Sequence, residues 1–169
     1  MRRIAVPKQE IDGYIAERMS APCFICEIAM GGQKRSAHHV LHEDENFIIF
    51  LSAMPTQYGH VLVCPRQHVE KIMEDLNLEA YLALQRMVWA AGRAIEDVVN
   101  PERIYVASFG SQQMNRHIHI HVVPLPSGVP IREQQMAAMM PESVGVVHLE
   151  EREWAALRDK LRIAIARYI

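Results

Sequence analysis

The stretch 117–123 reads His-Ile-His-Ile-His-Val-Val, so three histidines alternate with apolar residues. A β-strand sends successive side chains to opposite faces, and the alternation therefore predicts a strand with all three imidazoles on one face. The opposite face, with Ile118, Ile120 and Val122, is apolar and suited to a core. Because three polar rings would be a costly way to build a core, we expect the histidines to serve a site.

The spacing of these histidines bears on two kinds of site. In one, the three imidazoles jointly hold a catalytic metal; in the other, they divide metal binding and nucleophilic catalysis between them. Same-face side chains lie roughly 7 Å apart along a strand, so three in succession span about 13 Å. Zinc holds its ligands at about 2 Å, and joint ligation would require a sharp bend. The spacing favours the division of labour.

The three cysteines fall into two groups. Cys23 and Cys26 form a C-x-x-C pair, whereas Cys64 lies in the apolar run 61–64 and is expected to be a core residue. In a reduced compartment, the pair is either half of a zinc site or a redox dithiol. The histidines that are available as further zinc ligands stand at positions 38, 39, 42, 60, 68, 117, 119, 121 and 148.

Composition limits the class of protein. The chain has 169 residues, half of them hydrophobic, and a formal net charge of −2. We expect one domain over residues 1–169 and no extended basic surface for nucleic acid. No apolar run approaches the roughly 20 residues that span a bilayer, and the N-terminus lacks the apolar stretch of a signal peptide. The expected location is cytoplasmic, without a membrane partner.

Hydrophobic periodicity predicts the secondary structure. Helical spacing appears over residues 8–19, in a long helix from the N-cap Asn77 to about Asn100, and near the C-terminus. In the C-terminal helix, one face carries Trp154, Leu157, Leu161 and Ile165. Strand-like segments are 38–43, 46–52, 60–64, 103–109 and 117–123, with a shorter one at 144–149. The predicted fold class is α+β, with a mainly antiparallel five-stranded sheet, one long helix and flanking N- and C-terminal helices.

Several segments together resemble the histidine triad family. Its hallmark is His-φ-His-φ-His-φ-φ, where φ is apolar, and residues 117–123 match it at every position. Upstream, residues 23–28 (Cys-Phe-Ile-Cys-Glu-Ile) look like the family's zinc knuckle, and residues 59–68 (Gly-His-Val-Leu-Val-Cys-Pro-Arg-Gln-His) are similar to its G-H-x-L-V-φ-P-K-x-H segment. The resemblance covers about residues 22–124, and the C-terminal extension 125–169 lies outside it.

The resemblance implies hydrolysis or transfer at the α-phosphorus of a nucleotide conjugate, such as a dinucleoside polyphosphate or a phosphoramidate. It makes His119 the nucleophile of a covalent nucleotidyl-histidine intermediate, and it places His121 and Gln113 near the phosphate. It also implies a homodimer formed through the long helix and the adjoining sheet edge.

The resemblance further implies a closed, structural zinc site. Its ligands would be Cys23, Cys26, His68 and His117. The histidines at 38, 39 and 42 are then interpreted as ordinary polar residues, and His60 and His148 as structural hydrogen-bonding groups.

The chain departs from the family where many members hold the ribose with an acidic residue, because Ser52 stands at that place. Glu142 and Glu150 are candidates to replace this acid, and Phe47, with Ile49 and Leu51, is a candidate for the nucleoside pocket. Two alternatives to the nucleotide hydrolase or transferase stay open. One is a nucleotide-binding or regulatory module with structural zinc and little turnover, and the other is a metal-dependent hydrolase that uses the triad as ligands.

Overall fold

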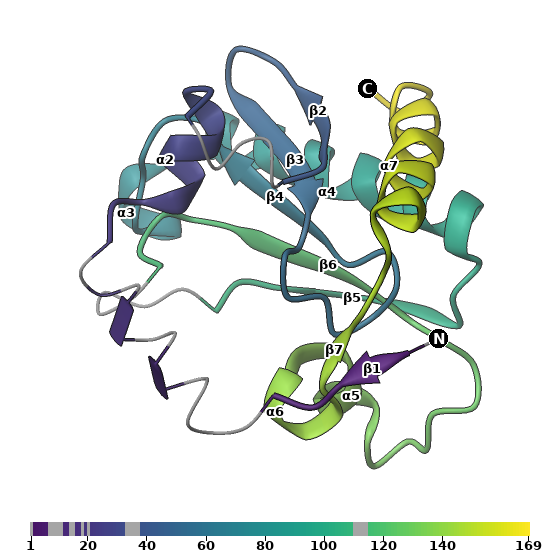
Figure 1. Cartoon of the computed structure of the whole chain (residues 1–169). Coiled ribbons are helices and arrows are strands. Elements are labelled where there is room, and N and C mark those ends of the chain that lie inside the picture. Colours follow the sequence, from purple (N-terminus) through teal and green to yellow (C-terminus); the bar gives the residue numbers. More distant parts are fainter. Residues whose placement is uncertain are drawn as a thin grey trace.

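The computed structural model describes residues 2–6, 12–13, 16–17, 19, 21–32, 38–109 and 115–169 (Figure 1). The elements are, in chain order, β1 (Arg3–Ile4), α2 (Phe24–Ala29), β2 (Val40–Glu43), β3 (Phe47–Leu51), β4 (Val61–Pro65), α3 (Ile72–Asp75), α4 (Leu78–Val99), β5 (Arg103–Ala107), β6 (Ile120–Leu125), α5 (Gln134–Met139), α6 (Pro141–Val144), β7 (Val146–Val147) and α7 (Glu151–Ile165).

A five-stranded sheet in the order β2-β3-β4-β6-β5 forms the centre of the molecule. Each neighbouring pair is antiparallel, which confirms the predicted α+β class and the antiparallel sheet. A second sheet, which the sequence did not predict, pairs β1 with β7. Strand β7 lies within the predicted short strand 144–149, whereas β1 was not predicted, because its two residues are too few to give a periodic signal.

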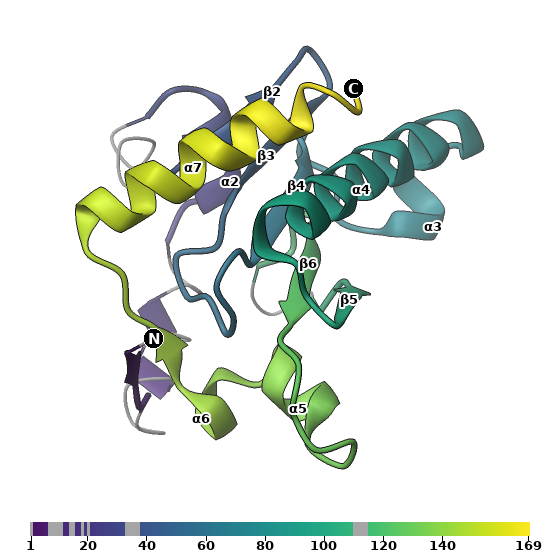
Figure 2. The same cartoon turned by 90° about the vertical axis from the view of Figure 1, so that its right-hand side faces the viewer.

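Both faces of β3 and β4 are buried, because helices pack on each side of the sheet. Phe47, Ile49 and Leu51 of β3 belong to the larger core, together with apolar residues of α4 and α7. Figure 2 shows α4 and α7 next to each other, and the two helices are in contact. Ile48 and Phe50 point the other way and form a smaller core with α2. Cys64 lies in this smaller core, as expected.

The long helix α4 begins and ends as the sequence predicts. The Asn77 side chain accepts a hydrogen bond from the Ala80 amide at 2.8 Å, which is an N-cap interaction. Asn100 adopts the left-handed conformation, with φ of 52°, and ends the helix before Pro101. The C-terminal helix α7 is also confirmed, and it buries Leu157, Leu161 and Ile165.

The histidine segment is less regular than predicted. Strand β6 begins at Ile120, so only His121 of the three histidines lies in it, and the predicted strand over residues 117–123 starts three residues too early. Before Ile120 the chain leaves the ladder, because the Ile118 amide donates to the Val69 carbonyl at 2.8 Å. The three imidazoles are therefore not held in one flat row.

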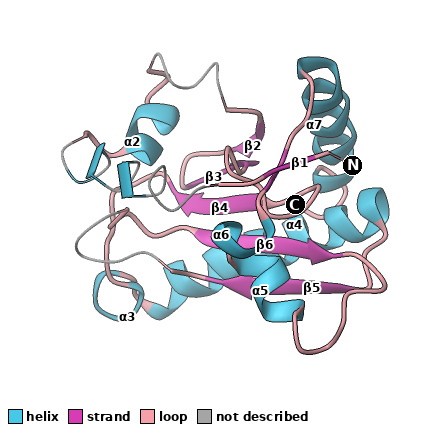
Figure 3. Cartoon of the chain, turned by 60° about the horizontal axis from the view of Figure 1, so that its bottom comes forward, coloured by secondary structure: helices cyan, strands magenta, loops and turns pink. Residues whose placement is uncertain are grey.

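Two terminal regions complete the description. The predicted helix 8–19 lies mostly outside the described residues, although Asp12, Gly13, Ala16, Glu17 and Met19 within it are helical. In the C-terminal extension, α5 packs against β6, as Figure 3 shows. Among the helices that the structure describes, none is both long and apolar enough to cross a membrane.

Candidate active site

Four side chains from three separate parts of the chain form a possible metal site. Cys23 and Cys26 come from the start of α2, His68 follows β4, and His117 precedes β6. One ligand atom from each of the four lies within 4.8 Å of the others. The Nδ1 atom of His117 is 3.3 Å from Cys23 Sγ, and that of His68 is 3.2 Å from Cys26 Sγ. In a tetrahedral zinc site, sulfur and nitrogen ligands lie about 3.5 Å apart, so the donors fit one ion.

The remaining ring nitrogens of this cluster are also engaged. His117 Nε2 lies 2.9 Å from the Pro65 carbonyl oxygen, and His68 Nε2 lies 3.1 Å from a carboxylate oxygen of Glu70. Both partners accept, so each neutral ring carries its proton on Nε2 and directs its Nδ1 lone pair at the cluster. Metal-binding histidines are usually held in this way.

The surroundings of Cys26 bear on whether the cysteine pair is a redox dithiol. None of the three cysteines is in a disulfide. Burial, together with neighbouring Cys23, raises the pKa of the Cys26 thiol to about 11. Reactive cysteines need a lowered pKa, so the raised pKa of Cys26 does not favour a redox role for this residue.

A cavity of about 280 Å³ lies beside the metal cluster and holds the other two histidines of the triad. Its walls include residues of α2, β3, the loop between β3 and β4, β4, β6 and the C-terminal extension. The lining residues are Phe24, His38, Phe50, Ser52, Ala53, Met54, Thr56, His60, Leu62, Asn115, His119, His121, Met139 and Pro141.

His119 is held in one protonation form at the wall of this cavity. Its Nδ1 atom lies 2.7 Å from the His117 carbonyl oxygen, which only accepts, so Nδ1 carries the ring proton and Nε2 keeps a lone pair. Burial lowers the pKa of His119, which keeps the ring neutral. The Ser108 hydroxyl donates to the His119 carbonyl at 3.0 Å and fixes the backbone. The result is an oriented, neutral imidazole with a nucleophilic nitrogen.

His121 lies next to His119 and has a histidine partner of its own. The ring centroids of His119 and His121 are 5.1 Å apart. His121 Nδ1 is 2.9 Å from Nε2 of His60, which hydrogen-bonds as the sequence analysis expected. Burial, with a smaller contribution from His119, lowers the pKa of His121 to about 4. Both triad histidines in the cavity are therefore uncharged near neutral pH.

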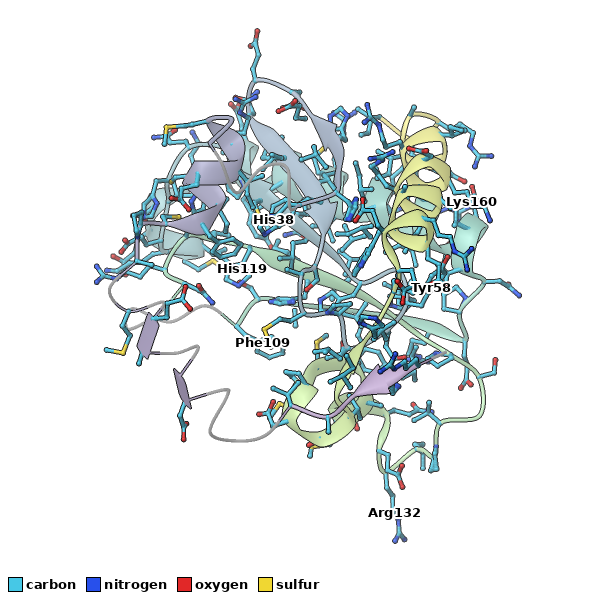
Figure 4. All side chains as sticks on the ribbon, viewed as in Figure 1. His38, Tyr58, Phe109, His119, Arg132 and Lys160 are labelled. Carbon is cyan, nitrogen blue, oxygen red and sulfur yellow. The ribbon has the colours of Figure 1, made fainter. Side chains whose placement is uncertain are left out.

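Three aromatic rings, from Phe24, His38 and Phe50, line the cavity; Figure 4 labels His38, and it labels His119 as well. The centroid of Phe24 lies 6.3 Å from that of His38, and the His38 ring stands edge-on to Phe50 at 5.7 Å. Phe24 also lies edge-on to His119 at 6.3 Å. Sequence reasoning did not select these residues for the site, although Phe24 lies between the two knuckle cysteines.

The candidates for the nucleoside pocket need one correction. Phe47 lies in the core under α4 and α7 and does not line the cavity, so Phe50 is the phenylalanine of β3 that does. Ser52, on the same face as Phe50, is buried and lines the cavity.

The remaining candidates lie elsewhere. The Glu150 side chain caps α7, and Glu142 is exposed and does not line the cavity. Gln113 lies outside the described residues.

Comparison with known proteins identifies the group to which the chain belongs. Residues 22–137 match the family model described as scavenger mRNA decapping enzyme C-term binding. The chain belongs to the histidine triad family. Among curated members, it is 26% identical over 106 residues to a bifunctional adenosine 5′-phosphosulfate phosphorylase/adenylylsulfatase of Arabidopsis thaliana, covering 62% of this chain and 70% of the relative. It is 28% identical to an adenosine 5′-monophosphoramidase of Schizosaccharomyces pombe, covering 62% and 75%.

Solved structures of histidine triad proteins share the fold. A hypothetical histidine triad nucleotide-binding protein from Sulfolobus tokodaii has a TM-score of 0.67 at 22% identity, covering 86% of this chain and 93% of that chain. A zinc-bound histidine triad protein from Mycobacterium smegmatis has a TM-score of 0.65 at 25% identity, covering 89% and 96%. Histidine triad relatives include nucleotide hydrolases, which supports this class of activity at the level of the family.

Proposed function

We propose that this protein is a nucleotide hydrolase or nucleotidyltransferase that acts at the α-phosphate of a nucleotide conjugate through His119. The observation that carries the proposal is the hydrogen bond from His119 Nδ1 to the His117 carbonyl, which leaves a neutral Nε2 at the cavity wall. Dinucleoside polyphosphates and nucleotide phosphoramidates are the proposed types of substrate.

The proposed reaction proceeds in two displacements. The lone pair of His119 Nε2 attacks the α-phosphorus, a P–N bond forms, and the bond to the leaving group breaks as that group takes up a proton. Water or another acceptor then attacks the same phosphorus and gives up a proton, which replaces the one taken by the leaving group; the P–N bond breaks, and Nε2 regains its lone pair. Nucleophilic catalysis of this kind replaces one difficult displacement by two easier ones. His121 lies close enough to His119 to contact an oxygen of the bound phosphate.

The chemistry of the donor set supports zinc as the metal. Two thiolates and two imidazoles are typical of closed, structural zinc sites. When bound there, zinc would tie the start of α2 to the segment before β6 and so help hold His117. His119 and His121 are outside the cluster, which favours the division of labour over a metal held by the whole triad.

The proposed zinc is tested by metal content. Protein prepared without chelator is expected to hold one zinc per chain, and Cys23→Ser is expected to lose it and to lower the melting temperature, because a structural metal contributes to folding. Cys64→Ala, a cysteine outside the cluster, should keep the metal. Metal-free wild-type protein, or a disulfide between Cys23 and Cys26, would overturn the assignment.

His119→Asn tests the nucleophile. Release of nucleoside monophosphate is expected to fall by about three orders of magnitude or more, because no nitrogen lone pair remains to form the intermediate. Metal content and melting temperature should stay near the wild-type values, since His119 is not in the cluster. Near-normal turnover contradicts the mechanism. If the wild-type protein binds nucleotide but releases no monophosphate, the binding-module alternative is supported instead.

Ser52 provides a test of sugar selectivity. A hydroxyl replaces the expected carboxylate, and charged hydrogen bonds contribute about 1.5 to 3 kcal/mol against roughly 0.5 to 1.5 for neutral ones. We expect ribo substrates to be preferred over 2′-deoxy substrates by less than about tenfold in kcat/KM, and Ser52→Asp to widen that ratio by about an order of magnitude. A hundredfold preference in the unmodified protein would show that another group replaces the acid.

Homodimer formation is the last part of the proposal. Leu78 and Leu82 on α4 are 70% and 53% exposed, and β5, with Val106 51% exposed, is an edge of the sheet. Light scattering is expected to give twice the chain mass of 19.3 kDa. Leu82→Arg should reduce it to one chain, whereas Ile163→Arg, on the exposed side of α7, should not. A wild-type monomer at micromolar concentration contradicts the dimer.

A further inference from the structure

The loop between β3 and β4 reaches the cavity and is held by α5 and by Arg3 of β1. Thr56 and Gln57 of this loop are each only 2% exposed. The Thr56 hydroxyl donates to the Ala138 carbonyl at 2.5 Å, and the Gln57 amide donates to the Ala137 carbonyl at 2.7 Å, so both bind α5. From the N-terminal side, the Arg3 guanidinium donates to the Thr56 carbonyl at 2.7 Å and to Gln57 Oε1 at 2.8 Å.

Thr56 also determines where the ring proton of His60 lies. The Thr56 amide donates to His60 Nδ1 at 3.3 Å, and an amide N–H cannot accept. The Thr56 hydroxyl oxygen also lies 3.3 Å from His60 Nδ1, while its own proton goes to the Ala138 carbonyl, which can only accept. The amide N–H decides between the two tautomers because it can only donate: a neutral His60 accepts it with the Nδ1 lone pair and keeps its proton on Nε2. Burial strongly lowers the pKa of His60, so this neutral form persists near neutral pH.

The same direction of donation continues to His121. His60 Nε2 and His121 Nδ1 are 2.9 Å apart, and one proton has to lie between them. Since that proton belongs to His60 Nε2, His121 accepts on Nδ1 and carries its own proton on Nε2. The chain of bonds runs from the Thr56 amide through His60 to His121.

This polarity makes the two cavity histidines complementary. His119 offers a lone pair on Nε2, whereas His121 offers an N–H donor from Nε2. Phosphate oxygens only accept, so the reverse form of His121 would turn a lone pair toward them. The structure thus places a nucleophile and a donor side by side, with ring centroids 5.1 Å apart.

We propose that Thr56 is a positioning residue. Held by α5 and Arg3, it fixes the tautomer of His60 and, through His60, the tautomer of His121. His121 Nε2–H then donates a hydrogen bond to the phosphate or to its leaving group, which rests on the function proposed above. The C-terminal extension thus acts on the histidine pair through one buried hydroxyl, besides supplying Met139 and Pro141 to the cavity wall.

The first test is spectroscopic and uses the wild-type protein with ¹⁵N-labelled histidine. Nuclear magnetic resonance is expected to show His60 and His121 protonated on Nε2, and His119 on Nδ1, at neutral pH. An Nδ1-protonated His60 or His121 overturns the proposal. Because this measurement does not need a substrate, it stands even when the wild type releases no monophosphate, a result that would refute only the proposed function.

The second test compares two variants of Thr56. Thr56→Val keeps the branched shape but removes the hydroxyl that binds Ala138, and Thr56→Ser keeps that hydroxyl. In Thr56→Val, we expect a mixture of the two His121 tautomers and a tenfold loss of kcat, with KM changed less than twofold. In Thr56→Ser, the single His121 tautomer and the wild-type kcat should be kept. Wild-type ring forms and kcat in Thr56→Val refute the role of Thr56. If that variant does not fold, Arg3→Met is the substitute, with a smaller shift expected in the same direction and an unchanged spectrum as the refuting result.

Discussion

His117 is the residue through which the metal cluster and the cavity depend on each other. Its Nδ1 atom lies 3.3 Å from Cys23 Sγ and 3.5 Å from Cys26 Sγ, and its Nε2 atom donates to the Pro65 carbonyl at the end of β4. Its backbone carbonyl accepts a hydrogen bond from Nδ1 of the His119 ring. His117 therefore directs its own Nδ1 lone pair at the candidate metal site and leaves the lone pair of His119 on Nε2, at the cavity wall. Any change that rotates His117 in its cluster also moves the acceptor that orients His119.

Much of the fold could be predicted because its elements have a clear period or a local end signal. The long helix α4 has Asn at both ends, each acting through its own backbone geometry or side chain, and these signals need no distant partner. The four metal-site residues came from the resemblance rather than from spacing. Spacing contributed the separate conclusion that three histidines on a strand would not share one ion. The structure adds a reason, since His117 leaves the strand to reach the cysteines while His121 stays in β6.

Two features could not be read from the sequence, for different reasons. Strand β3 is buried on both faces, so alternation does not show which face meets the large core and which meets the cavity. Phe47 and Phe50 are equally apolar, and only the packing of α2 assigns the cavity to Phe50. The start of β6 was also predicted wrongly. The alternation of His and Ile begins at His117, whereas pairing with β4 begins only at Ile120.

The loop between β3 and β4 shows why the C-terminal extension is more than a cover. Burying a polar side chain costs free energy unless it is hydrogen-bonded, and an apolar wall would close the cavity at lower cost. Thr56 and Gln57 are nonetheless buried, and their partners in α5 lie 82 and 80 positions away in the sequence. Apolar contacts are non-directional and tolerate sliding, whereas these bonds set both the position and the rotation of the loop. His60 lies at the end of that loop. Its ring contacts the Thr56 amide on one side and His121 on the other, and both hydrogen bonds need this fixed orientation.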